Sequence, residues 1–69
     1  MNIRAKEIDY HYNTKGWGET ATIYEMPVGK KYSVICKVHH EYQERELHVR
    51  TFRTDSLKRA QEYARNFVA

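Results

Sequence analysis

Apolar and polar residues alternate along most of the chain up to Phe52, in four runs separated by short turn sequences. An alternation with a period of two is typical of strands that bury one face, and Tyr, Ile, Val and Thr, which favour strands, are frequent in these runs. The pattern predicts strands over residues 3–12, 20–26, 31–41 and 45–52. Because the connections are short, neighbouring strands are expected to be antiparallel.

The turn at residues 27–30 fixes the pairing of the second and third strands. Pro27 presets φ and Gly29 tolerates a positive φ, so these residues favour a tight turn in which Met26 pairs with Lys31. The resulting register predicts four cross-strand pairs, Ile23–Val34 and Ala21–Cys36 on one face and Thr22–Ile35 and Tyr24–Ser33 on the other.

The loop at residues 41–44 sets the register of the third and fourth strands in the same way. It predicts Val38 opposite Leu47 and Cys36 opposite Val49, which keeps one apolar face continuous across three strands. The members of this face are expected to be buried; they are Ala21, Ile23, Val34, Cys36, Leu47 and Val49.

A helix is expected after the last strand, with Thr54 or Asp55 as its N-cap and Ser56, in the first turn, also explained by capping. Its apolar stripe consists of Leu57, Ala60, Ala64, Phe67 and Val68, and its outer side carries Lys58, Arg59, Glu62, Arg65 and Asn66. Packing this stripe on the apolar sheet face gives a single α+β domain over residues 1–69. The fold is a three- to four-stranded antiparallel sheet with one C-terminal helix packed on one face.

The first strand carries two apolar phases, with Ile3 and Ala5 in one and Ile8, Tyr10 and Tyr12 in the other. A β-bulge near residues 6–7 would reconcile them. Without a bulge, half of the strand exposes apolar side chains, and these would form an interface with a second copy of the chain. A homodimer is therefore one expectation.

Charge and composition narrow the class of partner. Twelve Lys and Arg against nine Asp and Glu give a net charge of +3, a mild preference for anionic partners. No charged and then apolar leader is present, and no apolar run approaches the roughly 20 residues that span a bilayer. Together with the lone Cys36, this predicts a cytoplasmic protein with no disulfide and no membrane segment.

Neither catalysis nor metal binding is indicated. Ser33 and Ser56 lie in no nucleophile motif, and Cys36 is expected to be an inert core residue. Gly16-Trp17-Gly18 lacks the third glycine of a dinucleotide loop and is interpreted as a turn with an aromatic tip. His39 and His40 point to opposite faces of a strand, and His39 shares a face with His48 but with no third ligand at a recognisable spacing. No cofactor is expected.

The sheet face away from the helix carries the candidate binding surface. It mixes hydrogen-bonding, cationic and aromatic side chains, and its members are Thr20, Thr22, Tyr24, Lys31, Ser33, Ile35, Lys37, His39, Glu46, His48 and Arg50. Nucleic-acid-binding sheets use this mixture, and so does an ordinary solvated sheet face. Exposed aromatics, which favour an interface of either kind, are expected at Tyr10, Tyr12, Trp17, Tyr24 and Tyr42.

The segment Thr51-Phe52-Arg53-Thr54, followed by Ala60, Tyr63 and Ala64, resembles the DNA-binding domains of plant ethylene-response factors and the arm-binding domains of tyrosine integrases. The order of Trp17-Gly18, Ala21 and Pro27 is similar to that of the second strand in this family. The resemblance implies a three-stranded sheet in the major groove with the helix behind it, and it makes Tyr24, Lys37, His48 and Arg50 the DNA-facing residues. The chain departs from the pattern by an additional strand at residues 31–41 and by lacking an arginine-dense first strand.

The sequence thus favours a small non-enzymatic binding module. The first hypothesis is nucleic-acid binding through the open sheet face, with Tyr24, Lys37, His39, His48 and Arg50 as the contact residues. The alternative is a protein-binding inhibitor or adaptor, of the type carried by phages and mobile elements, that acts through exposed aromatics or a strand edge.

Overall fold

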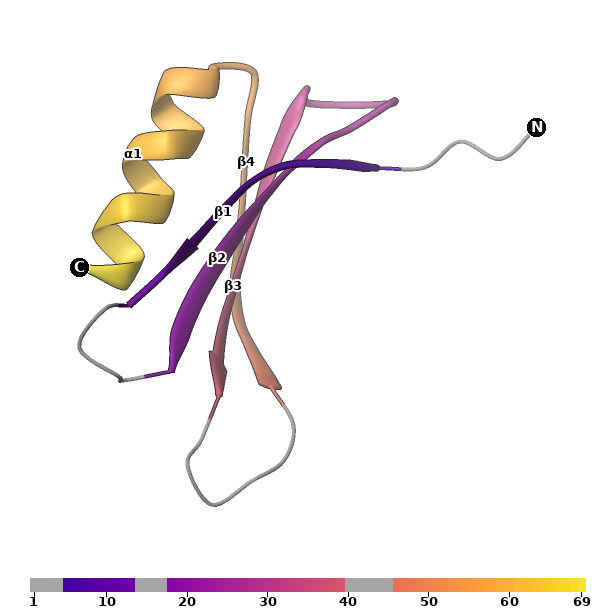
Figure 1. Cartoon of the computed structure of the whole chain (residues 1–69). Helices are drawn as coiled ribbons and strands as arrows, with labels where there is room; N and C mark the ends of the chain where they lie inside the picture. Colours follow the sequence, from indigo (N-terminus) through magenta and orange to yellow (C-terminus); the bar gives the residue numbers. More distant parts are fainter. Residues whose placement is uncertain (1–4, 14–17, 40–45) are drawn as a thin grey trace.

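A computed structural model describes residues 5–13, 18–39 and 46–69. It contains four strands and one helix: β1 (Lys6–Tyr12), β2 (Glu19–Glu25), β3 (Tyr32–His39), β4 (Glu46–Thr54) and α1 (Leu57–Val68). The sheet is antiparallel throughout, in the order β1-β2-β3-β4, and α1 lies against one face of it (Figure 1). The predicted α+β fold with a C-terminal helix is confirmed. Of the predicted turn at residues 16–18, the structure describes Gly18, and the predicted loop at residues 41–44 lies outside the described residues.

The pairing of β2 with β3 follows the predicted register. The backbone N–H of Met26 donates to the carbonyl of Lys31 at 2.6 Å, and Gly29 has a φ of 80° in the turn. All four predicted cross-strand pairs are present. This hairpin follows from its sequence because a proline and a glycine leave the turn little choice of geometry.

The pairing of β3 with β4 starts as predicted and then shifts. Val38 is opposite Leu47, but a β-bulge at Val49 places Arg50, rather than Val49, opposite Cys36. The prediction of Cys36 opposite Val49 is therefore wrong. The bulge turns Phe52 toward the helix, opposite Val34, whereas a regular ladder would leave this aromatic ring in water.

A second bulge lies in β1. Glu7 is opposite Tyr24 and Asp9 is opposite Ile23, so Ile8 is the additional residue. The predicted bulge is confirmed in kind and lies one residue further along the chain than expected. It does not bring the strand's tyrosines under the helix, since the residues after it alternate with Tyr10 on the face opposite α1.

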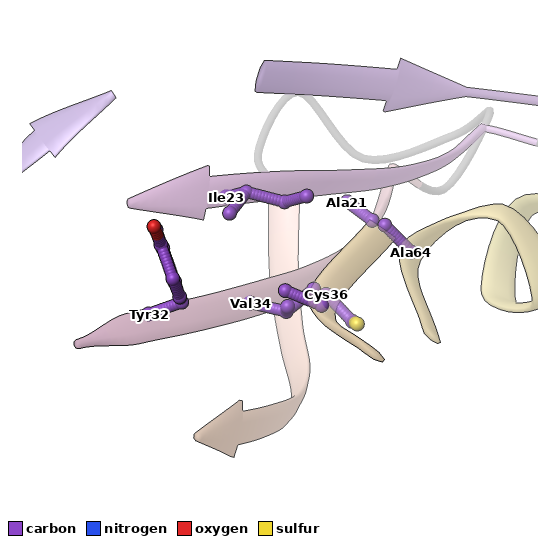
Figure 2. Packing of buried hydrophobic residues seen from close by; sticks show 7 residues of the cluster. Ala21, Ile23, Tyr32, Val34, Cys36 and Ala64 are labelled. Atoms are coloured by element: carbon purple, nitrogen blue, oxygen red, sulfur yellow. The ribbon is translucent and has the colours of Figure 1, made fainter. Parts of the chain in front are cut away.

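The core lies between α1 and the middle of the sheet. Its buried members are Ala21, Ile23, Tyr32, Val34, Cys36, Ala60 and Ala64, with Phe52, Tyr63, Phe67 and Val68 packed against them. Figure 2 shows Ala64 next to Ala21 of β2, where two small side chains allow the helix to approach the sheet closely. The predicted stripe on α1 is buried at Ala60 and Ala64, and Leu57 stays 38% exposed.

Leu47 and Val49, predicted in the core, are 45% and 51% exposed. The reason is the direction of α1, which starts after the Thr54 end of β4 and ends beside Asn13, the residue after β1. The helix therefore crosses the sheet toward β2 and β1 and leaves the Leu47 end of β4 uncovered.

Side chains at both ends of α1 attach the helix to the sheet. Ser56 is the N-cap, and its hydroxyl accepts from the backbone N–H of Arg59, so the prediction of Thr54 or Asp55 as the cap is wrong. Thr54 instead accepts from the Ser56 N–H, and the Asp55 carboxylate accepts from the Lys31 N–H at 2.9 Å. At the other end, the Asn13 side chain donates to the carbonyl of Val68 at 2.7 Å.

Candidate functional site

Three rows of side chains cross the open face, which we define as the sheet face opposite α1. The strand register gives the rows as Tyr12–Thr20–Lys37–His48, Tyr10–Thr22–Ile35–Thr51 and Glu7–Tyr24–Ser33–Arg53. Each row takes one residue from each strand. Aromatic, hydroxyl and cationic side chains of distant segments are therefore brought side by side.

Two tyrosines dominate the β1 end of this face. Tyr10 is 51% exposed and Tyr12 is 62% exposed, and their ring centroids lie 6.2 Å apart with an angle of 30° between the ring planes. We call them the tyrosine pair. Successive outward residues of one strand hold the rings next to each other, so the pair presents two adjacent aromatic surfaces to solvent.

The basic side chains of the open face lie on the other half of the sheet. Lys37 extends from β3, and His48 and Arg53 extend from β4, where both are exposed. His48 Nε2 lies 2.6 Å from the Thr51 hydroxyl, a contact between residues three apart on one strand. In a regular strand such residues point to opposite faces, and the bulge at Val49 brings them onto the same one.

The predicted site residues are not all on this face. Tyr24, Lys37 and His48 are brought together there, and His39, exposed near the end of β3, belongs to it by alternation. Arg50 lies on the helix side, because the bulge reverses its direction, so its assignment to the open face is wrong.

Sequence reasoning also missed a member of the site. Arg53 is on the open face opposite Ser33, where the regular register would have turned it under the helix. The signal that could have found it is the pattern around Phe52, whose burial requires both neighbours, Thr51 and Arg53, to face outward.

On the helix side, Arg50 forms a hydrogen bond to one member of an aromatic stack. Its Nη1 donates to the hydroxyl of Tyr63 at 3.2 Å, and the Tyr63 ring stacks on Phe52 at 4.4 Å with a 9° angle between the planes. The hydrogen bond to Tyr63 raises the pKa of the Arg50 guanidinium, which stays a cation. Burial raises the pKa of the neighbouring Cys36 thiol, and the Arg50 charge opposes this shift.

Among the residues that the structure describes, no group of three or more His, Cys, Asp and Glu side chains could hold a metal ion. The pair formed by Asp9 and His11, 2.9 Å apart, is part-buried on β1 and contains two ligands at most. Within the same residues, no helix has the length and apolar character needed to cross a membrane.

No family model matches the chain, and neither does any curated protein or solved structure. The resemblance to the ethylene-response and integrase-arm domains therefore stays a prediction that depends on the residues quoted for it.

Proposed function

We propose that the chain is a non-enzymatic module that binds single-stranded nucleic acid through the open face. The observation that carries the proposal is the layout of the three rows, with the tyrosine pair at one end and Lys37, His48 and Arg53 at the other. The net charge of +3 adds a weak general attraction for a polyanion.

The two ends of the face suit different parts of a nucleotide. Bases stack on exposed aromatic rings, and each stacked base contributes about 1–3 kcal/mol in single-strand binding. Lysine and arginine side chains neutralise phosphates, while hydroxyls such as those of Thr20 and Thr22 reach sugars and base edges. A strand of about four nucleotides, running across the sheet from β1 to β4, would use both ends.

Dimensions favour a single strand over a duplex. Neighbouring strands are about 4.8 Å apart, so the four strands of this sheet span about 14 Å between the outer backbones. The major groove of B-DNA is about 12 Å wide and admits a helix or a two-stranded ribbon. The full open face is therefore too wide to enter the groove, whereas a flexible single strand can lie along it.

Fluorescence anisotropy with a labelled ten-nucleotide oligothymidylate tests the proposal. Replacing both Tyr10 and Tyr12 by alanine is expected to weaken binding at least tenfold, and the double variant Lys37→Gln/Arg53→Gln is expected to weaken it similarly. The matched control is Lys58→Gln/Arg65→Gln, which removes the same charge from the outer side of α1.

Three results would contradict the proposal: no binding at low salt, tighter binding of a duplex of the same length, or equal weakening by the helix control. The slope of log K against log salt gives a further criterion. Two phosphate contacts on a single strand predict a slope of about −1.4.

A nucleic-acid-binding function fits a reducing, cytoplasmic setting, since the one cysteine, Cys36, is unpaired and buried.

A protein partner at the β4 edge is the second candidate. Leu47 and Val49 are both about half exposed on this outer strand, which among the described residues pairs with β3 alone and so presents one edge to a partner strand. The double variant Leu47→Ser/Val49→Thr should abolish capture of such a partner and leave oligonucleotide binding unchanged. Capture that survives these changes, or that is lost in the tyrosine variant, would exclude the β4 edge as its site.

A further inference from the structure

A groove lies between β4 and α1, on the side of the sheet away from the open face. Arg50 of β4 and Tyr63, Asn66 and Phe67 of α1 line it, and its volume is about 440 Å³. We call it the Arg50 groove. Sites for small molecules commonly have volumes of about 300–1,000 Å³ and combine apolar walls with a few convergent polar groups, which describes this lining.

The bulge is what places a cation in this groove. In a regular ladder Val49 would occupy the position opposite Cys36, and the additional residue gives this position to Arg50 instead. Bulges are frequent beside binding sites, where they redirect a side chain. The redirected guanidinium donates a hydrogen bond to the Tyr63 hydroxyl, and the Tyr63 ring stacks on Phe52.

Among the residues that the structure describes, the Arg50 guanidinium uses few of its donors. It has five N–H groups, and the one side-chain acceptor that it has among the described residues is the Tyr63 hydroxyl. Within the described part of the chain, no carboxylate lies within ion-pair distance of Arg50. A planar cation that has no counter-ion among the described residues can donate two parallel hydrogen bonds to an external oxyanion.

We propose that the Arg50 groove binds a small molecule with an oxyanion head on a flat, apolar body. The head is a carboxylate or a phosphate, and the Arg50 guanidinium binds it. The Asn66 amide lines the same groove and offers a second hydrogen-bond donor. The body lies against the rings of Tyr63 and Phe67. This site is separate from the proposed nucleic-acid surface, since Arg50 and Arg53 point to opposite faces of β4.

Titration of the ¹⁵N-labelled chain with benzoate, phenyl phosphate and neutral benzamide tests the site. For such small probes we expect saturable binding with a Kd of about 1 mM for at least one of the two anions, and at least tenfold weaker binding of benzamide. Comparison of benzoate with phenyl phosphate distinguishes a carboxylate ligand from a phosphate ligand.

Variants assign the binding to the groove. Arg50→Gln should weaken the favoured anion at least tenfold, and Tyr63→Phe, which keeps the ring and removes the hydroxyl, should weaken it a few fold. Arg53→Gln is the matched control on the same strand and should leave the anion affinity unchanged while it weakens oligonucleotide binding.

Two results would overturn the inference: no saturable shift with either anion at 10 mM, a concentration about tenfold above the expected Kd, or Arg50→Gln binding as tightly as the unchanged chain. Failure of oligonucleotide binding alone would not contradict the proposal for the Arg50 groove, because the two proposals are tested with different variants and different probes.

Discussion

Cys36 of β3 lies directly opposite Arg50 of β4, although the cysteine is fully buried and the arginine is exposed. Both side chains belong to the helix side of the sheet. The pairing depends on the single additional residue Val49, which reverses the direction of every β4 side chain after it. One residue thus decides which arginine faces the open surface and which faces the helix.

Deletion of Val49 tests this account of β4. Because Val49 is the bulged residue, its removal joins His48 to Arg50 in a regular ladder and keeps Phe52 under the helix. We expect a folded protein whose free energy of unfolding changes by about 1–2 kcal/mol or less. The measurement is a nuclear Overhauser contact between Phe52 and Tyr63. In a chain without the bulge, the deletion would turn Phe52 outward and the contact would be lost.

Phe52 is expected to contribute more to stability than its strand position suggests. Replacing it by alanine removes the ring that stacks on Tyr63 and leaves a cavity beside the core, at a cost of about 2–3 kcal/mol for this half-buried side chain. Thr51→Ala on the open face is the control and should cost about 0.5 kcal/mol or less. Urea unfolding measures both. Equal costs would show that Phe52 is not part of the core.

Gly18 is required both for its positive φ and for its close approach to His39. Gly29 shares only the positive φ, so comparing the two glycines separates the two effects. Both have a positive φ, of 77° and 80°, but a Cβ at Gly18 would overlap the carbonyl oxygen of His39, whereas a Cβ at Gly29 would meet nothing. Gly29→Ala should therefore cost about 1–2 kcal/mol, from backbone strain alone. Gly18→Ala should cost about 2 kcal/mol more, because the clash breaks the hydrogen bond from the His39 N–H to the Gly18 carbonyl. Similar unfolding midpoints for the two variants would refute the close approach.

The raised pKa of the Cys36 thiol predicts that the protein loses stability at alkaline pH. Burial raises its pKa in the folded state, so the folded protein holds this proton more tightly than the unfolded chain does. The stabilisation that this proton contributes is complete below the unfolded pKa of about 8.5. It is lost as the pH rises toward the folded pKa, and the free energy of unfolding then falls by up to about 1.4 kcal/mol per pH unit. Cys36→Ala should be less stable overall but lose less stability between pH 8 and 10. Parallel pH profiles would contradict the prediction.

The parts of the fold that the sequence predicts are those that a local rule determines. Pro27 and Gly29 fix the β2–β3 turn, and the turn fixes the register of the whole hairpin. The alanines of α1 likewise identify its buried stripe without knowledge of the rest of the chain. In the turn and in the helix, a single local geometry satisfies the pattern of apolar and polar residues.

The phase of β4 is a tertiary property, and local alternation could not give it. Leu47, Val49 and Phe52 are all apolar, and no single phase of a regular strand buries all three. The path of α1 from the Thr54 end of β4 toward β1 and the stack of Phe52 on Tyr63 decide the outcome in favour of Phe52. The assignment of Arg50 to the open face failed for this reason, and Arg53 was missed for the same one.

Mapping of an oligothymidylate onto the ¹⁵N-labelled chain tests the central claim most directly. The account predicts shifts concentrated on the open face, at the tyrosine pair and at Thr20, Lys37, His48 and Arg53, with the outer side of α1 and the Arg50 groove unaffected. Shifts concentrated on Lys58, Arg59 and Arg65 of the helix, or no shifts at low salt, would contradict it.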